Sequence, residues 1–296
     1  MIPPGGPPRS EPGRVSPIRR LSGRLRPRTR PRFKGPSFNR VVPNIMTMVG
    51  LCAGLTSLRF AIESHFALSA AAIVLAGVID GLDGRLARLL KGTSRFGAEF
   101  DSLADFLCFG VAPAFTIYLW SLAAWTGFGF VPALLFALCM ALRLARFNAA
   151  LDVRPAPAYA YNFFTGVPAP AGAGLALLPL FVGLEAQSIG WHWLEAAARF
   201  PLTGVFVLIG TAALLVSTLP VWSFKNFKVP AEYVLPLMIG TGAYIAFLVA
   251  DPWGALALLA VIYLGMLPFS RRSFHSLRSE AEAMRAPDEP PRAQAS

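Results

Sequence analysis

The sequence predicts an all-α protein, a bundle of about eight transmembrane helices, from its composition and from the length of its uncharged stretches. The chain of 296 residues is 55% hydrophobic, only 15% of its residues are charged, and its mean hydropathy is +0.54. Soluble proteins carry charges on about a quarter of their residues. Several stretches of about 17 to 25 residues hold few or no charges, the length that a helix needs to cross a hydrocarbon core of roughly 30 Å. We therefore expect six to eight spans and no sizeable soluble domain.

Residues 1–40 form a basic arm that we expect to be disordered and cytoplasmic. They contain nine prolines, and ten Arg and one Lys against a single acidic residue, Glu11. With few large apolar side chains, the arm cannot bury enough surface to offset its ordering entropy. An organelle transit peptide is also rich in Arg, but it would contain more serine and an amphipathic run. Beside membrane spans, such an arm is expected to contact anionic lipid headgroups and no nucleic acid.

The membrane-embedded domain extends over residues 41–270 and contains eight candidate spans. In chain order they are about 41–62, 66–90, 96–120, 129–150, 163–184, 202–223, 233–250 and 254–269. The last of these is short for a full crossing. Residues 271–296 form a polar tail, which we expect to be cytoplasmic.

Charges in the connections between the spans predict the orientation. With the N-terminus in the cytoplasm, the inner connections and the tail contain Lys91, Arg95, Arg154, Lys225, Lys228, Arg271, Arg272 and Arg278. The outer connections contain Glu63, Glu185, Glu195, Arg199 and Asp251. This excess of basic residues inside predicts an even number of spans and places both termini in the cytoplasm, in a multi-pass protein of the cytoplasmic (inner) membrane.

Four aspartates lie in or beside the second and third predicted spans. Residues 80–105 read DGLDGRLARLLKGTSRFGAEFDSLAD, and the aspartates are Asp80, Asp83, Asp101 and Asp105. An unpaired carboxylate at membrane depth is costly, so such a group normally faces a partner, a cavity or a metal ion. For one aspartate alone, an ion pair with Arg85 or Arg88 would be sufficient. Four aspartates at helical spacing need a shared explanation.

Helical periodicity arranges these residues in two stripes. The first stripe repeats every four residues and consists of Asp80, Gly84 and Arg88, with Asp83 and Ala87 beside it. The second stripe, on the next helix, consists of Gly97, Asp101 and Asp105. Because the connection is short, the two helices should be antiparallel, and the stripes can meet. Glu99 lies off the second stripe, and we expect it to be solvated at the level of the headgroups.

Four converging carboxylates would repel one another unless a cation lies among them. Carboxylate oxygens without His or Cys ligands suit hard ions, so we expect Mg²⁺, Mn²⁺ or Ca²⁺ and not Zn²⁺. Such ions often bridge phosphate oxygens. Gly84, Ala87 and Gly97 would let a ligand approach closely, and Arg88 can pair with a phosphate through its planar guanidinium group.

The same string resembles the motif of the CDP-alcohol phosphatidyltransferases, D-x2-D-G-x2-A-R-x8-G-x3-D-x3-D, and matches it at every fixed position. The resemblance implies a helical membrane enzyme, usually a homodimer, with a polar cavity open to the cytoplasm. It implies a metal site, with Mg²⁺ or Mn²⁺, formed by Asp80, Asp83, Asp101 and Asp105. It also implies that Asp105 is the general base and that the CDP site is lined by Gly84, Ala87, Arg88 and Gly97.

The VPNIMT stretch at 42–47 resembles a second, shorter element of this family, P-N-x-x-T. This resemblance implies that Asn44 and Thr47 hydrogen-bond the diphosphate or groups bound to the metal. A helix N-cap just after a proline is an equally open role for Asn44.

Two further strings resemble the membrane-embedded phosphatidylserine synthases of the family: RLARFN at 143–148 and FFTGVPAPAGA at 163–173. The resemblance covers about residues 40–270 and implies CDP-diacylglycerol as donor and serine as acceptor. A serine carboxylate needs a cationic partner, and the candidate acceptor-binding residues are Arg143, Arg146 and Asn148.

Several alternatives remain open at this point. Both arginines can instead extend to the headgroups as topology determinants. The acceptor can be another alcohol, such as glycerol 3-phosphate, inositol phosphate or choline. A divalent-cation transporter is the alternative outside enzymes, because carboxylates in spans also mark ion pathways. We expect Pro168 and Pro170 to kink a helix and not to bind substrate.

Overall fold

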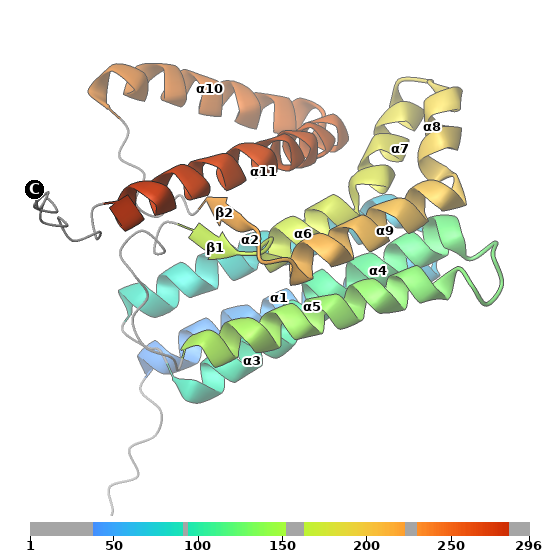
Figure 1. The fold of residues 1–296 in the computed structure, drawn as a ribbon. Coiled ribbons are helices and arrows are strands. Elements are labelled where there is room, and N and C mark those ends of the chain that lie inside the picture. The colour runs from blue at the N-terminus through green and yellow to red at the C-terminus, as the bar shows by residue number, and fades with distance from the viewer. Residues whose placement is uncertain (1–37, 91–93, 152–162, 223–229, 284–296) are drawn as a thin grey trace, which may run out of the picture. The chain divides into compact units, whose positions relative to one another are not determined.

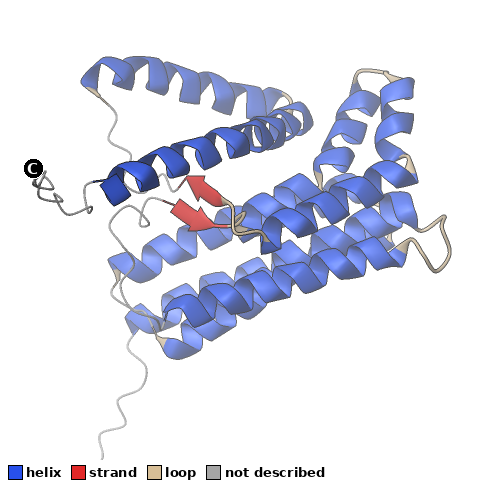
Figure 2. Ribbon diagram, in the orientation of Figure 1, coloured by secondary structure: helices blue, strands red, loops and turns tan. Residues whose placement is uncertain are grey.

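The computed structural model describes residues 38–90, 94–151, 163–222 and 230–283, so most of the basic arm and its predicted disorder lie outside the described residues. The described part is helical apart from one short ribbon of two strands (Figure 1 and Figure 2). Its elements are α1 (Phe38–Ile62), α2 (Phe66–Leu89), α3 (Arg95–Asp105), η1 (Phe106–Val111), α4 (Ala112–Ile117), η2 (Tyr118–Leu122), α5 (Phe130–Leu151), β1 (Phe163–Thr165), α6 (Ala169–Ala176), α7 (Leu178–Ser188), α8 (His192–Arg199), α9 (Pro201–Val216), β2 (Pro220–Trp222), α10 (Ala231–Ala250) and α11 (Pro252–Ala283).

Six helical segments of the described chain are long and apolar enough to cross a membrane. The number rises to eight if each of two bent helix pairs counts as one span. In these pairs, α6 meets α7 at 46° and α8 meets α9 at 55°. The predicted helical membrane fold with six to eight spans is therefore confirmed.

The predicted fifth span, 163–184, was wrong at its beginning, and the predicted sixth span, 202–223, was wrong at its end. Residues 163–165 and 220–222, which were expected to be helical, form the antiparallel ribbon, with Phe163 opposite Trp222. Gly166 follows β1 with φ +80°, and a Cβ at this position would lie 2.8 Å from the carbonyl oxygen of Ser217. Only glycine combines this backbone conformation with this close approach. The ribbon thus adds a small β element to an otherwise helical fold.

The last predicted span was too short. Helix α11 continues to Ala283, past the expected end of the membrane domain at residue 270. Its apolar part, Pro252–Arg272, has 21 residues and is long enough to cross a membrane.

Prolines explain where the bent pairs break. Pro179 is the second residue of α7 and Pro201 the first of α9, and neither has an N–H group to extend the preceding helix. Pro168 is the N-cap residue of α6 and Pro170 lies in its first turn. These two prolines therefore begin a helix, whereas we had expected them to kink one.

The segment from Arg95 to Leu122 is one long helix that twice changes from α to π geometry. The first π stretch, η1, begins directly after Asp105. Pro113 cannot donate a hydrogen bond to the carbonyl group of Phe109, which removes one α-helical bond at this point. Such π turns are frequent beside functional sites.

The buried core holds this long helix against its neighbours. Helix α1 packs along α2, and η1 contacts α1, α2, α5 and α6. At the contact with α5, a Cβ on Gly110 would lie 3.0 Å from Met140, which is fully buried. Helix α10 differs, because it packs mainly on α11 and none of its apolar stretch is buried. The aspartate-bearing helices thus belong to the best-packed part of the described chain.

Candidate active site

Helices α2 and α3 bring the predicted aspartate stripes together. Ser94 is the N-cap residue of α3, and its Oγ accepts a hydrogen bond of 3.0 Å from the backbone N–H of Gly97. Such a cap fixes where the helix begins. Asp101 and Asp105 then follow Gly97 at intervals of one turn and face the C-terminal part of α2.

Three of the four aspartates form a compact group. One carboxylate oxygen from each of Asp80, Asp101 and Asp105 can be chosen so that all three lie within 4.8 Å of one another. Oxygen ligands of Mg²⁺ or Ca²⁺ lie about 2.0–2.6 Å from the ion, so two ligands of one ion are at most about 5 Å apart. The three half-buried carboxylates therefore have the spacing that one ion requires.

The fourth aspartate, Asp83, is held beside this group by α1. Its side chain is buried, and its Oδ2 accepts a hydrogen bond of 2.9 Å from the hydroxyl group of Thr47. The same hydroxyl lies 3.1 Å from the carbonyl oxygen of Pro43. Because a hydroxyl group has a single hydrogen, Thr47 donates it to one of the two oxygens at a time, and the charged carboxylate is the stronger acceptor.

All four aspartates line one small cavity together with Thr47. Its volume of about 10 Å³ is close to that of a single water-sized sphere. The aspartates and Thr47 offer oxygen ligands, which fit a small hard cation, and the lining contains no His. Its one thiol, Cys108, donates to the carbonyl oxygen of Gly50 at 3.5 Å. The predicted convergence of the four carboxylates is thus seen in the structure.

A larger cavity of about 210 Å³ adjoins the first and shares Thr47, Asp83 and Asp101 with it. All six residues that the family resemblance assigned to CDP line this cavity: Asn44, Thr47, Gly84, Ala87, Arg88 and Gly97. It is also lined by three residues that we did not predict, Pro43, Ser94 and Ala98. Ser94 had a signal in the sequence, because a serine just before a helix is a typical N-cap.

Asn44 lies inside α1, so the N-cap alternative for this residue was wrong. Its Oδ1 is only 2.8 Å from the position of a Cβ built on Gly97, which shows how closely α1 approaches α3. In contrast, no atom lies within 4 Å of a Cβ built on Gly84. Gly97 therefore allows α1 and α3 to meet, whereas Gly84 leaves free space in the cavity wall.

No arginine forms an ion pair with the four aspartates among the residues that the structure describes. The ion pairs among the described residues are Arg59–Glu63, His65–Glu63 and His192–Glu195, and none of these includes an aspartate of the cluster. Arg88 is exposed, and its Nε donates to the carbonyl oxygen of Gly84 at 2.9 Å. Pairing with Arg85 or Arg88 therefore does not account for the aspartates. Glu99 is exposed, as its place off the stripe predicted.

The three candidate acceptor residues lie outside both cavities and are bonded to other groups. Arg143 is half-buried, and its Nε donates to the carbonyl oxygen of Val167 at 2.6 Å. Its guanidinium group also interacts electrostatically with Asp105. These contacts inside the protein argue against extension of Arg143 to the headgroups.

Arg146 and Asn148 connect α5 to other segments. Arg146 donates to the carbonyl oxygens of Val216 and Ser217, at 2.8 and 3.2 Å, where α9 ends. Asn148 Nδ2 donates to the hydroxyl group of Ser102 at 2.9 Å, next to Asp101. Asn148 thus holds α5 against α3 beside Asp101, and Arg146 holds α5 against the end of α9.

Comparison with known proteins agrees with this geometry. Residues 40–216 match the family model "CDP-alcohol phosphatidyltransferase", and residues 232–268 match "CDP-alcohol phosphatidyltransferase 2". Three relatives are named CDP-diacylglycerol–serine O-phosphatidyltransferase. The protein from Mycobacterium tuberculosis H37Rv is 39% identical over 246 residues, 82% of each chain. The protein from Mycobacterium leprae is 39% identical over 86% of this chain and 82% of its own length. The protein from Helicobacter pylori J99 is 33% identical over 75% of this chain and 87% of its own length. The chain belongs to the CDP-alcohol phosphatidyltransferase family.

Proposed function

We propose that this protein transfers the phosphatidyl group of CDP-diacylglycerol to the hydroxyl group of L-serine, giving phosphatidylserine and CMP. The observation that carries the proposal is the group of three carboxylates with oxygens within 4.8 Å, beside a cavity lined by the family motif. The serine-specific names of relatives that are 33 to 39% identical support serine as the acceptor. A cation transporter is not favoured, because the four aspartates line one small cavity and do not form a path across the membrane.

Asp80, Asp83, Asp101 and Asp105 are the residues that would hold a divalent metal, Mg²⁺ or Mn²⁺. The all-oxygen donor set and the small cavity support this assignment. When bound, the metal supplies positive charge that neutralises the diphosphate and stabilises CMP as the leaving group. Thr47 orients the Asp83 carboxylate through its hydrogen bond of 2.9 Å.

Asp105 is our candidate for the general base. The serine hydroxyl oxygen attacks the phosphorus next to diacylglycerol, its proton moves to the Asp105 carboxylate, and the bond from this phosphorus to CMP breaks. Proton transfer that accompanies bond formation does not need a base as strong as the alkoxide, so a well-placed carboxylate is sufficient. Asp105 is the last aspartate of the α3 stripe, and its carboxylate lies beside those of Asp80 and Asp101, which supports this role.

The CDP group would occupy the cavity of about 210 Å³. Gly84, Ala87 and Gly97 leave room for it, and Asn44 and Arg88 offer hydrogen-bond donors at its wall. Thr47 also lines the wall, with its hydroxyl hydrogen donated to Asp83. For serine, Arg143 is the strongest of the three candidates, because it is half-buried and interacts with Asp105. Arg146 and Asn148 would act indirectly, by holding the segments around the site.

The distribution of charge supports a multi-pass protein of the cytoplasmic membrane with both termini in the cytoplasm. Acidic Glu63 and Asp251 lie in connections at one end of the spans, and the aspartate cluster lies near the other end, close to Arg95. In this arrangement serine and the CDP headgroup of the donor lipid reach the site from the cytoplasmic side. By the family resemblance, we also propose that the protein is a homodimer.

An acceptor screen tests the proposed function. Protein purified in detergent is incubated with CDP-diacylglycerol, Mg²⁺ or Mn²⁺, and one acceptor at a time: serine, glycerol 3-phosphate, inositol phosphate or choline. We expect CMP release and a new phospholipid with serine alone. Release of CMP with another acceptor and not with serine would contradict the serine assignment and leave the phosphatidyltransferase chemistry in place.

A further inference from the structure

We propose that the phenol group of Tyr263, on α11, binds the carboxylate group of the acceptor together with Arg143. This inference rests on the proposed function, in which the acceptor is serine. It assigns a residue that the sequence analysis did not select, and it explains how a site made for a phosphatidyl donor can also select an amino acid.

The phenol oxygen of Tyr263 is the starting observation. This atom is shielded from solvent, yet it has no hydrogen-bond partner among the described residues. Buried hydroxyl groups in folded proteins are almost always hydrogen-bonded, and each exception calls for an explanation. A ligand that supplies the missing acceptor is one such explanation.

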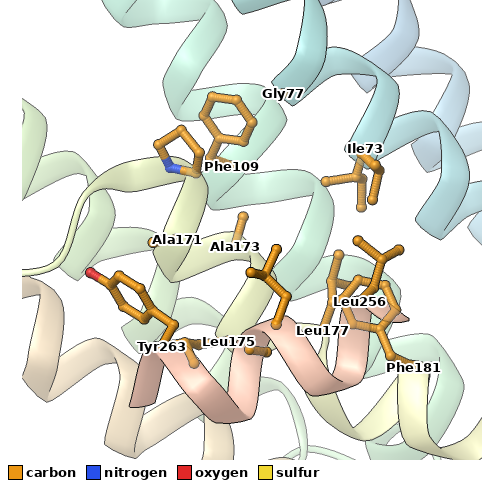
Figure 3. Close-up of a pocket in the computed structure, with 15 residues that line it drawn as sticks. Ile73, Gly77, Phe109, Ala171, Ala173, Leu175, Leu177, Phe181, Leu256 and Tyr263 are labelled. Atoms are coloured by element: carbon orange, nitrogen blue, oxygen red, sulfur yellow. The ribbon is translucent and has the colours of Figure 1, made fainter. Parts of the chain in front are cut away.

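The surroundings of Tyr263 show from which side a ligand would approach. The residue lines a pocket of about 280 Å³ between α2, η1, α6, α7 and α11, and it supplies the one hydroxyl group in that lining (Figure 3). In Figure 3 the hydroxyl group points away from the apolar end of the pocket, where Ile73, Leu256 and Phe181 lie. The polar end of the pocket is thus the end where α6 begins.

Arg143 reaches the same place from α5. Its Nε is fixed on the carbonyl oxygen of Val167, just before α6, and the first turn of α6 contributes Pro170 and Ala171 to the pocket of Tyr263. The positive charge of the guanidinium group acts on the Asp105 carboxylate, and Tyr263 lies near enough that its phenolate form would also be affected by this charge. Within the described part of the chain, Nε is the one nitrogen of the Arg143 side chain that forms a hydrogen bond, so the two terminal nitrogens can bind a ligand.

The pocket also adjoins the aspartate cluster. Phe109 lines both the pocket of Tyr263 and the small cavity of the four aspartates. Phe109 follows Asp105 by one helical turn, and Gly77, in the same pocket, precedes Asp80 by one turn. A small molecule at Tyr263 would therefore share the Phe109 wall with the cavity that holds the proposed general base.

The chemistry of these donors suits a carboxylate. Two guanidinium N–H groups and one phenol O–H can donate to the two oxygens of a carboxylate, and bonds to a charged acceptor are the strong ones. In serine, two carbon atoms separate the carboxylate carbon from the hydroxyl oxygen. A carboxylate held between Arg143 and Tyr263 would thus direct the hydroxyl group toward Asp105. An amino alcohol without a carboxylate would leave both donors unpaired.

The test is Tyr263→Phe, which removes the hydroxyl oxygen and keeps the ring. We expect the KM for serine to rise about tenfold, as for the loss of a hydrogen bond to a charged group, and the KM for CDP-diacylglycerol to change less than about twofold. The preference for serine over serinol, which lacks the carboxylate, should fall by the same factor. The melting temperature without serine should not fall, because the oxygen has no partner in the protein.

Tyr244→Phe is the matched control. The Tyr244 hydroxyl group donates to the carbonyl oxygen of Ala255 at 3.1 Å, away from the site. This change should lower the melting temperature and leave both KM values as in the wild type. Combining Tyr263→Phe with Arg143→Ala should raise the KM for serine by less than the product of the two single effects, because both residues bind one carboxylate.

The outcomes separate this inference from the proposed function. If the wild type uses serine and Tyr263→Phe keeps the wild-type KM for serine and the wild-type preference over serinol, Tyr263 does not bind the acceptor. A rise in the KM for CDP-diacylglycerol alone would place Tyr263 at the donor lipid and also overturn the inference. A wild type that does not use serine at all would overturn the proposed function itself.

Discussion

The glycines around the aspartate cluster look alike in the sequence but have different surroundings. A Cβ on Gly97 would lie 2.8 Å from Asn44 Oδ1 and 3.1 Å from Ser94 Oγ, whereas a Cβ on Gly81 would meet no atom within 4 Å. Spacing in the motif could predict that Gly97 faces the ligand. It could not show that Gly97 is where α1 contacts α3, because that contact joins residues far apart in the chain.

Gly97→Ala should impair donor binding through Asn44. The added methyl group would displace the Asn44 side chain from the wall of the 210 Å³ cavity. We expect the KM for CDP-diacylglycerol to rise roughly tenfold, which corresponds to about 1.4 kcal/mol. Steady-state kinetics at saturating serine measures this effect. Gly81→Ala is the control, and it should keep wild-type kinetics with equal or higher stability, because alanine favours the helix. A wild-type KM in Gly97→Ala would show that the position of Asn44 is unimportant for the donor.

At the scale of helices, hydropathy located the spans but not their interruptions. The ends of the predicted spans at 163–165 and 220–222 are apolar, and hydropathy does not distinguish an apolar strand from an apolar helix end. The ribbon depends on pairing between segments more than fifty residues apart, which no local pattern reveals. The prolines at 179 and 201 are a signal for the bends that our sequence analysis did not use, since proline commonly begins a helix and cannot continue one.

A buried chain of hydroxyl groups joins α1, α2 and α4. Ser57 and Ser69 lie 3.0 Å apart, Ser69 and Thr116 lie 2.9 Å apart, and Thr116 donates to the carbonyl oxygen of Ala112 at 2.8 Å. Each hydroxyl group has one hydrogen. Since Thr116 uses its hydrogen on Ala112, Ser69 must donate to Thr116 and Ser57 to Ser69. Ser69 is therefore the central link between three helices.

Ser69→Ala should destabilise the protein by about 1–2 kcal/mol, because it breaks two interhelical hydrogen bonds and leaves buried hydroxyl groups without those partners. Thermal unfolding in detergent would measure the change. Thr241→Ala is the control, since the exposed Thr241 hydroxyl group donates only to Leu237 in its own helix, at 2.8 Å. Equal stability of Ser69→Ala and wild type would mean that the chain contributes nothing to helix packing.

For the whole molecule, the two halves of the proposed site differ in how far the sequence could predict them. The metal and CDP half uses α1, α2 and α3, which follow one another in the chain, so helical periodicity and the resemblance to the family motif selected residues that line its two cavities. The acceptor half uses α5, α6 and α11, which meet only in the folded protein. The sequence therefore indicated Arg143 as a costly charge in an apolar helix but gave no reason to select Tyr263.

In the proposed mechanism, the four aspartates promote transfer to serine by holding a divalent metal. The most direct test measures CMP and phosphatidylserine formed from CDP-diacylglycerol and serine after treatment with EDTA and after return of Mg²⁺ or Mn²⁺. We predict equal amounts of both products, loss of both with EDTA, and recovery with either ion. Asp101→Asn should need far more metal, whereas Glu99→Gln, an exposed neighbour on the same helix, should behave as wild type. Full turnover in a rigorously metal-free sample would show that the four aspartates do not act by holding a metal.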